Sequence, residues 1–516
     1  MQELSQAKGA GGRHSWETGQ GKQDMARKIR NILVLLLCSV VTGTLLLMLI
    51  FLLPVEPARQ HVEESLYNMI EVREDPQGDA TRKGIVSLKE NFTDTLMVQN
   101  CLEKVEGKGL LEHAMYVYHY DIQGEDETTW LTEESLVRFL RQGPEGMHLR
   151  EYSKYWHGYL IFLKPLLLLM SWDHLEIFLL VVQVLFLVAV VMVSCFRKKP
   201  YLGLGLLCAF LFMKPLRIWM SLAMSVCWWI ILAAVLALLL FQEKLEERNW
   251  QGEFFLLVGI VTAYLDFLTY PIATLGIPFS IWLVQRQKMG QGGRTDGGKT
   301  DLQREKAGPA RKGTQGLEGE SAPGEAMQPE DRPAQEKRTA RKVGALAKEC
   351  GSILWPCICW AVGYAGMWGM KWVTAELTCQ TGTLRNAVWS IITRAEPLDG
   401  YQSFFSGVYR TWSAVMGQYD AAWYGILFGM VAAAAVVSGL ICLCKARNRN
   451  WGITMGALTM AALLPVGWMI LTQNHTAIHC LFTFRILGTS ILALWCMSVS
   501  SIRTIWQARR TGGTEK

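Results

Sequence analysis

The 516 residues are 51% hydrophobic and 19% charged, with a formal net charge of +6. A soluble chain of this length would divide into domains with alternating polar and apolar positions. Here the apolar residues form runs of about 20, which match the hydrocarbon core of a bilayer. Many Lys and Arg residues flank these runs, so membrane orientation explains the positive charge and we expect no nucleic-acid partner. The sequence therefore predicts an all-α, polytopic membrane protein with about ten spans and both ends in the cytoplasm.

The first part of the chain predicts a membrane anchor followed by a folded segment. Residues 1–30 carry several basic side chains and are expected to form a cytoplasmic tail. Residues 31–53 predict a retained transmembrane helix, because no small-residue cleavage pattern accompanies them. Residues 54–154 are too many for a simple connector and carry an excess of acidic residues. Three of their pieces show helical spacing, with Thr132 in the position of an N-cap, which predicts a small helical extracytoplasmic domain.

The next segments predict one short helix at the membrane surface and then five spans. Residues 155–172 are apolar, short and rich in aromatic residues, and Lys164 and Pro165 interrupt them. We therefore expect an interfacial or re-entrant helix. Residues 173–288 contain five predicted transmembrane helices, and the basic residues at 197–199 mark the cytoplasmic side.

The last part of the chain predicts a linker and four further spans. Residues 289–342 are rich in Gly and charged residues and lack aromatic ones, which predicts a disordered cytoplasmic linker, with a basic regulatory segment as the alternative. Residues 343–503 predict four transmembrane helices, with an outer segment at 375–422 that contains an amphipathic piece at 384–393. Residues 504–516 are expected to be a second cytoplasmic tail.

The 13 cysteines show no metal-ligand spacing, and we expect neither a metal nor a cofactor. Most of them lie inside apolar runs, where Cys behaves as a small hydrophobic residue. Cys101 and Cys379 fall in predicted outer segments, and whether they pair stays open.

Several ionisable residues stand at the outer ends of predicted spans, where such residues usually line a cavity or a site. Asp266 has too short a side chain to reach far, and Lys371 lies one turn inside a Trp-rich helix. His475 and His479 share a face if their segment is helical, and Arg485 follows them. Arg and Lys beside His suit a phosphate or pyrophosphate head group. The alternatives are interfacial side chains and a simple charge pair between Asp266 and Lys371.

Two carboxylates are candidates for a catalytic base in the predicted outer domain. Asp94 lies in a segment that also fits a helix start or a glycosylation sequon, and Glu56 follows the first span. A carboxylate beside a phosphate-binding cavity can deprotonate an acceptor hydroxyl. The sequence thus predicts Asp94 or Glu56 as catalytic residues.

The layout resembles the GT-C superfamily of membrane glycosyltransferases, including its protein mannosyltransferase and aminoarabinose transferase branches. In that family an outer loop with short helices precedes a membrane-surface helix with a His-Pro-Pro-Leu-like motif. His157 and Pro165 stand at that place here, and the resemblance implies a substrate-binding role for His157. It also implies a polyprenyl-phosphate-linked sugar donor and an acidic base in the loop. The family's acidic pair directly follows the first span, whereas here Glu56 stands alone there and Glu63 and Glu64 come later.

The leading hypothesis is a membrane glycosyltransferase that moves a sugar from a polyprenyl-phosphate donor to an envelope acceptor at the outer membrane face. The sequence also resembles polytopic proteins of Gram-positive bacteria, so we expect the bacterial plasma membrane. A transporter or flippase for a lipid-linked or anionic substrate is one alternative, although such proteins usually place charges near the midplane. A non-catalytic envelope-assembly protein is the other, and it predicts no deep pocket between the outer domain and the spans.

Overall fold

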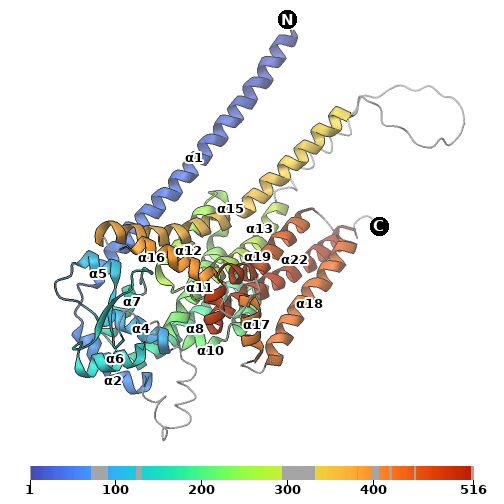
Figure 1. Cartoon of the computed structure of the whole chain (residues 1–516). Coiled ribbons are helices and arrows are strands. Elements are labelled where there is room, and N and C mark those ends of the chain that lie inside the picture. Colours follow the sequence, from blue (N-terminus) through green and yellow to red (C-terminus); the bar gives the residue numbers. More distant parts are fainter. Residues whose placement is uncertain are drawn as a thin grey trace, which may run out of the picture.

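The computed structural model describes residues 2–70, 91–123, 131–292, 332–379, 382–396, 406–417, 421–446 and 449–512. Helices dominate it, and a small domain packs against one end of a helical bundle (Figure 1). We call the described parts of residues 54–154 the loop domain. The first helix, α1 (Gln2–Ile50), joins the expected tail and the first span in one continuous element. Its far end and the first part of α15 (Arg332–Cys379) extend away from the loop domain (Figure 1).

The loop domain contains four described helices and also a two-stranded antiparallel sheet, which the sequence analysis did not predict. Tyr118 pairs with Glu151 at one end of the sheet and Asp121 with His148 at the other. A buried ion pair, Arg150 Nε to Asp121 Oδ2 at 3.2 Å, joins the strands. The elements are α2 (Glu56–Met69), α4 (Asn91–Leu102), α5 (Leu110–Tyr116), β1 (Tyr118–Asp121), α6 (Thr132–Gln142) and β2 (His148–Glu151).

The predicted helical pieces of this domain correspond to α2, α4 and α6, but the predicted cap of α6 is wrong. The N-cap residue is Leu131, which makes no side-chain capping bond. The Thr132 hydroxyl donates instead to the carbonyl of Phe92 at 3.5 Å, which connects α6 to α4.

The first half of the bundle begins with the expected short helix, and helices of different lengths follow it. The expected interfacial segment forms a helix of only eight residues, α7 (Leu160–Leu167), with Pro165 inside it. The helices that follow are α8 (Trp172–Phe196), α9 (Pro200–Phe212), α10 (Pro215–Trp219), α11 (Leu222–Glu247), α12 (Gln251–Leu265) and α13 (Ile272–Gly292).

The predicted linker lies mostly outside the described residues, which omit 293–331. Residues 332–342 are helical and belong to α15, so the disorder prediction is wrong for them. The later elements are α16 (Thr383–Ala395), α17 (Ser406–Gly417), α18 (Ala421–Lys445), α19 (Arg449–Leu471), α20 (Gln473–Ile478), α21 (Cys480–Thr483), η2 (Phe484–Leu487) and α22 (Gly488–Gly512).

Within the described residues, seven helices are long and apolar enough to cross a membrane. They correspond to α1, α8, α11, α15, α18, α19 and α22. Large apolar side chains such as Leu33, Phe196 and Leu440 are exposed along them, as the lipid-facing surface of a bundle requires. The chain is therefore a multi-pass helical membrane protein. The remaining expected spans are α9 and α12, which are shorter, and α13, a continuous helix that contains Pro278.

Glycines bring α12 and α15 into backbone contact. A Cβ added to Gly259 of α12 would lie 2.2 Å from the carbonyl oxygen of Trp360, and one added to Gly363 of α15 would lie 2.3 Å from that of Leu256. Neither separation is sterically possible, so only glycine permits this approach. Small residues at such contacts are the usual means of close helix packing in membranes.

Tyr264, near the end of α12, is hydrogen-bonded to two other parts of the fold. Its hydroxyl donates to the carbonyl of Gly43 in α1 at 2.8 Å. The backbone N–H of Gly158 donates to the Tyr264 carbonyl at 2.9 Å. Close by, the indole N–H of Trp156 donates to the Met367 carbonyl of α15 at 2.7 Å. These bonds fix the base of the loop domain on the bundle.

The glycine contact predicts a difference between two substitutions that have the same chemistry. Gly259→Ala should lower the free energy of unfolding by about 1–3 kcal/mol, because the new methyl group forces α12 and α15 apart. Gly369→Ala in α15 is the matched control, since nothing lies within 4 Å of its added Cβ. Thermal unfolding in detergent measures both variants. Equal melting temperatures for the two variants would contradict the contact.

Candidate functional site

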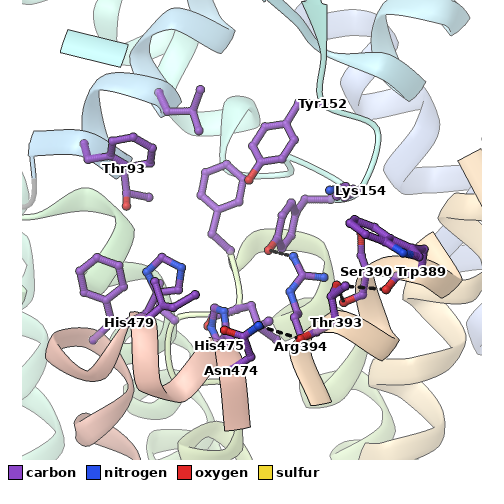
Figure 2. Close-up of a pocket in the computed structure, with 18 residues that line it drawn as sticks. Thr93, Tyr152, Lys154, Trp389, Ser390, Thr393, Arg394, Asn474, His475 and His479 are labelled. Carbon is purple, nitrogen blue, oxygen red and sulfur yellow. Dashed lines mark hydrogen bonds between the residues drawn. The ribbon is translucent and has the colours of Figure 1, made fainter. Parts of the chain in front are cut away.

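A cavity of about 380 Å³ lies where the loop domain meets α16, α20 and the turn between α12 and α13. Figure 2 shows side chains from these segments converging on it, with Thr93 and Trp389 on opposite sides and His475 and Arg394 below. The lining residues are Phe92, Thr93, Leu96, Tyr152, Lys154, Tyr155, Phe267, Leu268, Thr269, Trp389, Ser390, Thr393, Arg394, Asn474, His475, Ile478, His479 and Phe482.

Arg394 is the central cation of this cavity. It lies in the last turn of α16, and its Nη2 donates to the Tyr155 hydroxyl at 3.0 Å (Figure 2). Lys154 brings a second positive charge from the loop domain. Burial lowers the pKa of Lys154, and the charge of Arg394 lowers it further. Because the two cations repel each other across the cavity, a bound anion would be stabilised by both.

His475, in α20, and His479, the residue that follows α20, lie close together, as their spacing predicts, and both line the cavity with Arg394. Their ring centroids are 4.8 Å apart. Burial lowers the pKa of His475 to about 3 and that of His479 to about 4, and the Arg394 charge contributes to both shifts. Both rings are therefore neutral at pH 7.

The tautomer of His475 follows from its hydrogen bond. Nε2 lies 2.9 Å from the carbonyl oxygen of Leu268, which can only accept, so Nε2 carries the proton. Nδ1 is then the basic nitrogen. Because the pKa of the ring is about 3 in the free protein, this nitrogen can take a proton from a hydroxyl group once a bound anion raises that pKa.

A hydrogen bond between α20 and α16 positions these residues. The side-chain amide of Asn474 donates to the Thr393 carbonyl at 3.0 Å, which places the end of α16 beside the start of α20 (Figure 2). Arg394 and His475 immediately follow the two bonded residues in sequence. The pairing therefore brings Arg394 and His475 to the same part of the cavity, where the Arg394 charge contributes to the lowered pKa of His475.

The described lining residues include no carboxylate. The charged side chains among them are both basic, and the rest are aromatic, apolar, hydroxyl, amide or neutral imidazole groups. The rim is apolar, because Trp389 and Ile478 are 65% and 57% exposed. Such a cavity favours a ligand with an anionic group and an apolar tail.

Asp94, a predicted base, caps a helix instead of lining the cavity. Its Oδ1 accepts from the Ala223 N–H at 2.9 Å and from the Ser221 hydroxyl at 3.2 Å. Its Oδ2 accepts from the Leu222 N–H at 3.2 Å. The carboxylate thus satisfies the free N–H groups at the start of α11 and attaches α4 to the bundle. Its neighbour Thr93 is the residue that reaches the cavity.

Lys371 and Arg485, predicted to hold a phosphate, also bind backbone carbonyls outside the cavity. Lys371 Nζ donates to the carbonyls of Ala114 and Met115 at 3.0 and 2.6 Å, at the end of α5. Arg485 Nη1 donates to the Leu481 carbonyl at 2.6 Å, and the side chain is buried. A buried cation on the last carbonyls of a helix stabilises that helix end.

The other predicted residues support the cavity or lie away from it. Asp266 accepts hydrogen bonds from Thr269, so the charge pair with Lys371 is absent among the described contacts. His157 Nε2 donates to the carbonyl of Tyr152 at 2.6 Å and so positions a lining residue. Glu56 is the first residue of α2, and its side chain is 67% exposed.

Sequence reasoning missed Arg394, Lys154 and Tyr155. Arg394 directly follows the amphipathic piece at 384–393, and a cation at the end of a predicted surface helix was the available signal. Lys154 and Tyr155 mark the junction between the loop domain and the bundle. Their meeting with Arg394 depends on folding, because Arg394 and Tyr155 are 239 positions apart.

Comparisons with protein-family models, with curated proteins and with solved structures found no match. Among the described residues, no three His, Cys, Asp or Glu side chains cluster as a metal ion requires. Cys101 and Cys379 are both free thiols.

The position of Asp94 predicts a structural effect for its removal. Asp94→Ala should lower the free energy of unfolding by about 1–2 kcal/mol, because the N–H groups at the start of α11 lose their acceptor. Asp94→Asn keeps one acceptor oxygen and should retain part of that stability. Thermal unfolding is the measurement, and Glu106→Ala, at an exposed site of the loop domain, is the control. An Asp94→Ala protein as stable as the control would contradict the capping role.

Proposed function

We propose that the protein is a membrane glycosyltransferase that binds a polyprenyl-phosphate-linked sugar in the cavity beside Arg394. The observation that carries this proposal is the combination of Arg394 and Lys154 with the absence of any carboxylate among the described lining residues. Arg suits phosphate because its planar guanidinium donates two parallel hydrogen bonds. The loop domain would then lie on the outer membrane face, with the basic residues that follow α8 on the inner face.

The surroundings of the cavity suit the lipid part of this substrate. α16 exposes Val388, Trp389 and Ile392, whereas Thr383, Ala387 and Ser390 on its other side are buried. A helix with one exposed apolar face lies in the plane of the membrane interface. A polyprenyl chain running along this face would bring its phosphate to Arg394, in the last turn of the same helix.

Aromatic side chains inside the cavity suit the sugar. Tyr152 stacks on Phe267 with ring centroids 5.8 Å apart, and Tyr155 meets the same ring edge-on at 5.0 Å. Together they form an apolar wall with polar hydroxyl groups, against which the C–H face of a sugar can pack. The cavity volume is within the range of small-molecule sites.

The proposed reaction uses the basic nitrogen of His475. The acceptor hydroxyl oxygen attacks the anomeric carbon of the sugar, and the bond from that carbon to the phosphate oxygen breaks. Polyprenyl phosphate leaves with the electron pair, and Arg394 stabilises its added charge. The hydroxyl proton passes to Nδ1 of His475. We assign the base to His475 and not to Asp94 or Glu56, because neither carboxylate lines the cavity.

A binding comparison of two arginines on α16 tests the proposal. Arg394→Gln should weaken binding of a polyprenyl-phosphate-linked sugar by tenfold or more, because a charge-assisted phosphate contact contributes about 1.5–3 kcal/mol. Arg385→Gln, on the same helix but outside the cavity, should bind as the wild type does. Reconstituted protein with radiolabelled donor measures both binding and turnover. Equal affinity of the two variants would overturn the site, and movement of donor between leaflets without turnover would indicate a flippase.

The lowered pKa values of His475 and His479 predict how the affinity for the donor depends on pH. A phosphodiester near His475 and His479 raises their pKa values from about 3 and 4 toward neutral pH. The complex then holds more protons than the free protein, so affinity should increase as pH falls from 7.5 to 5.5, as linkage requires. The phosphodiester itself does not titrate in this window. His479→Gln should reduce the slope, and a slope equal to that of the wild type would contradict the assignment.

A further inference from the structure

A second polar pocket lies at the opposite end of α12 from the cavity. Its volume is about 170 Å³, and it is lined by Arg27, Lys28, Asn31, Arg248, Asn249, Trp250 and Glu253. The first three belong to α1, and the others come from the connection between α11 and α12 and from the start of α12. The length of α12, about 22 Å at 1.5 Å per residue, separates this pocket from the cavity. We call it the α1–α12 pocket.

Three cations face one carboxylate in this pocket, and that carboxylate is already hydrogen-bonded. Oε1 of Glu253 accepts from the Asn31 amide at 3.1 Å. Two of the cations lie over aromatic rings: Lys28 Nζ is 5.6 Å from the ring centroid of Trp355, and the Arg248 guanidinium is 4.9 Å from that of Trp250. Ring contacts orient a cation without neutralising its charge. The pocket therefore presents an excess of positive charge, with Asn249 as a further polar group.

The surroundings of the pocket combine this charge with apolar surface. On α1, Ile29 and Leu33 are exposed next to the basic residues, and Trp250 at the rim is 45% exposed. Exposed tryptophans concentrate at the membrane–water interface. From this pocket, α1 continues away from the loop domain toward the N-terminus (Figure 1). Basic pockets between helices at this depth suit the head groups of anionic lipids.

We propose that the α1–α12 pocket binds the phosphate group of an anionic phospholipid. Arg27, Lys28 and Arg248 contact the phosphate, Trp250 lies at the level of the glycerol backbone, and the acyl chains follow Ile29 and Leu33 along α1. The bound lipid joins α1 to α12, and it does so independently of the sugar donor at the other end of α12.

Native mass spectrometry of the full-length protein in detergent tests this proposal with three probes: phosphatidylglycerol, phosphatidylcholine and inorganic phosphate. Wild-type protein should retain phosphatidylglycerol in preference to phosphatidylcholine. An Arg27→Gln and Arg248→Gln double variant should lose roughly tenfold in phosphatidylglycerol affinity. Arg30→Gln is the matched control, because Arg30 is exposed on the same helix and outside the pocket. Thermal unfolding checks that each variant is folded.

The outcomes distinguish binding of a lipid from binding of a free phosphate ion. They also distinguish failure of this pocket from failure of the proposed donor site. Equal retention of the two lipids, or equal phosphatidylglycerol affinity in the double variant and the control, would overturn the proposal. Binding of inorganic phosphate with no retention of phosphatidylglycerol would also overturn it, in favour of a free anion. Arg394→Gln should leave phosphatidylglycerol binding unchanged, so failure of the donor site and failure of this pocket give different results.

Discussion

The backbone contact between α12 and α15 is the constraint on which the rest of the structure depends. Gly259 and Gly363 allow the two helices to touch, and these helices belong to parts of the chain that the predicted linker separates. α12 leads directly into the turn that contributes Phe267 and Leu268 to the cavity. α15 leads into α16, which contributes Arg394. The helix contact therefore sets the separation between the two walls of the proposed donor site.

Two buried charges, Asp94 and Lys371, hold helix ends in place. Asp94 binds N–H groups at the start of α11, and Lys371 binds carbonyls at the end of α5. Each attaches the loop domain to the bundle, because it forms hydrogen bonds with backbone groups that the helix end leaves unpaired. Such bonds are stronger in the protein interior, where the dielectric constant is low. The cations of the two proposed anion sites differ from these. Arg394 and Arg248 contact aromatic or phenolic groups at a pocket, which leaves their charge available to a ligand.

The sequence predicted the elements that depend on local pattern. Long apolar runs predicted the membrane helices, and seven of them form helices long and apolar enough to cross a membrane within the described residues. The i, i+4 spacing of His475 and His479 predicted their shared position. The sheet was not predictable in this way, because β1 and β2 are four residues each and pair only after the chain between them folds. Arg394 was missed for the same reason, since its partner Tyr155 is far away in sequence. The sequence of the outer domain also does not distinguish a carboxylate that caps a helix, such as Asp94, from a catalytic group.

The central claim is that the cavity beside Arg394 holds the head group of a lipid-linked substrate, and crosslinking tests it most directly. A polyprenyl-phosphate analogue with a photoreactive group next to the phosphate is irradiated with the reconstituted protein, and labelled peptides are identified by mass spectrometry. The account predicts labelling within Thr383–Ala395 and Gln473–Ile478, competed by unlabelled polyprenyl phosphate. Competed labelling confined to other segments, with none in these two helices, would contradict it.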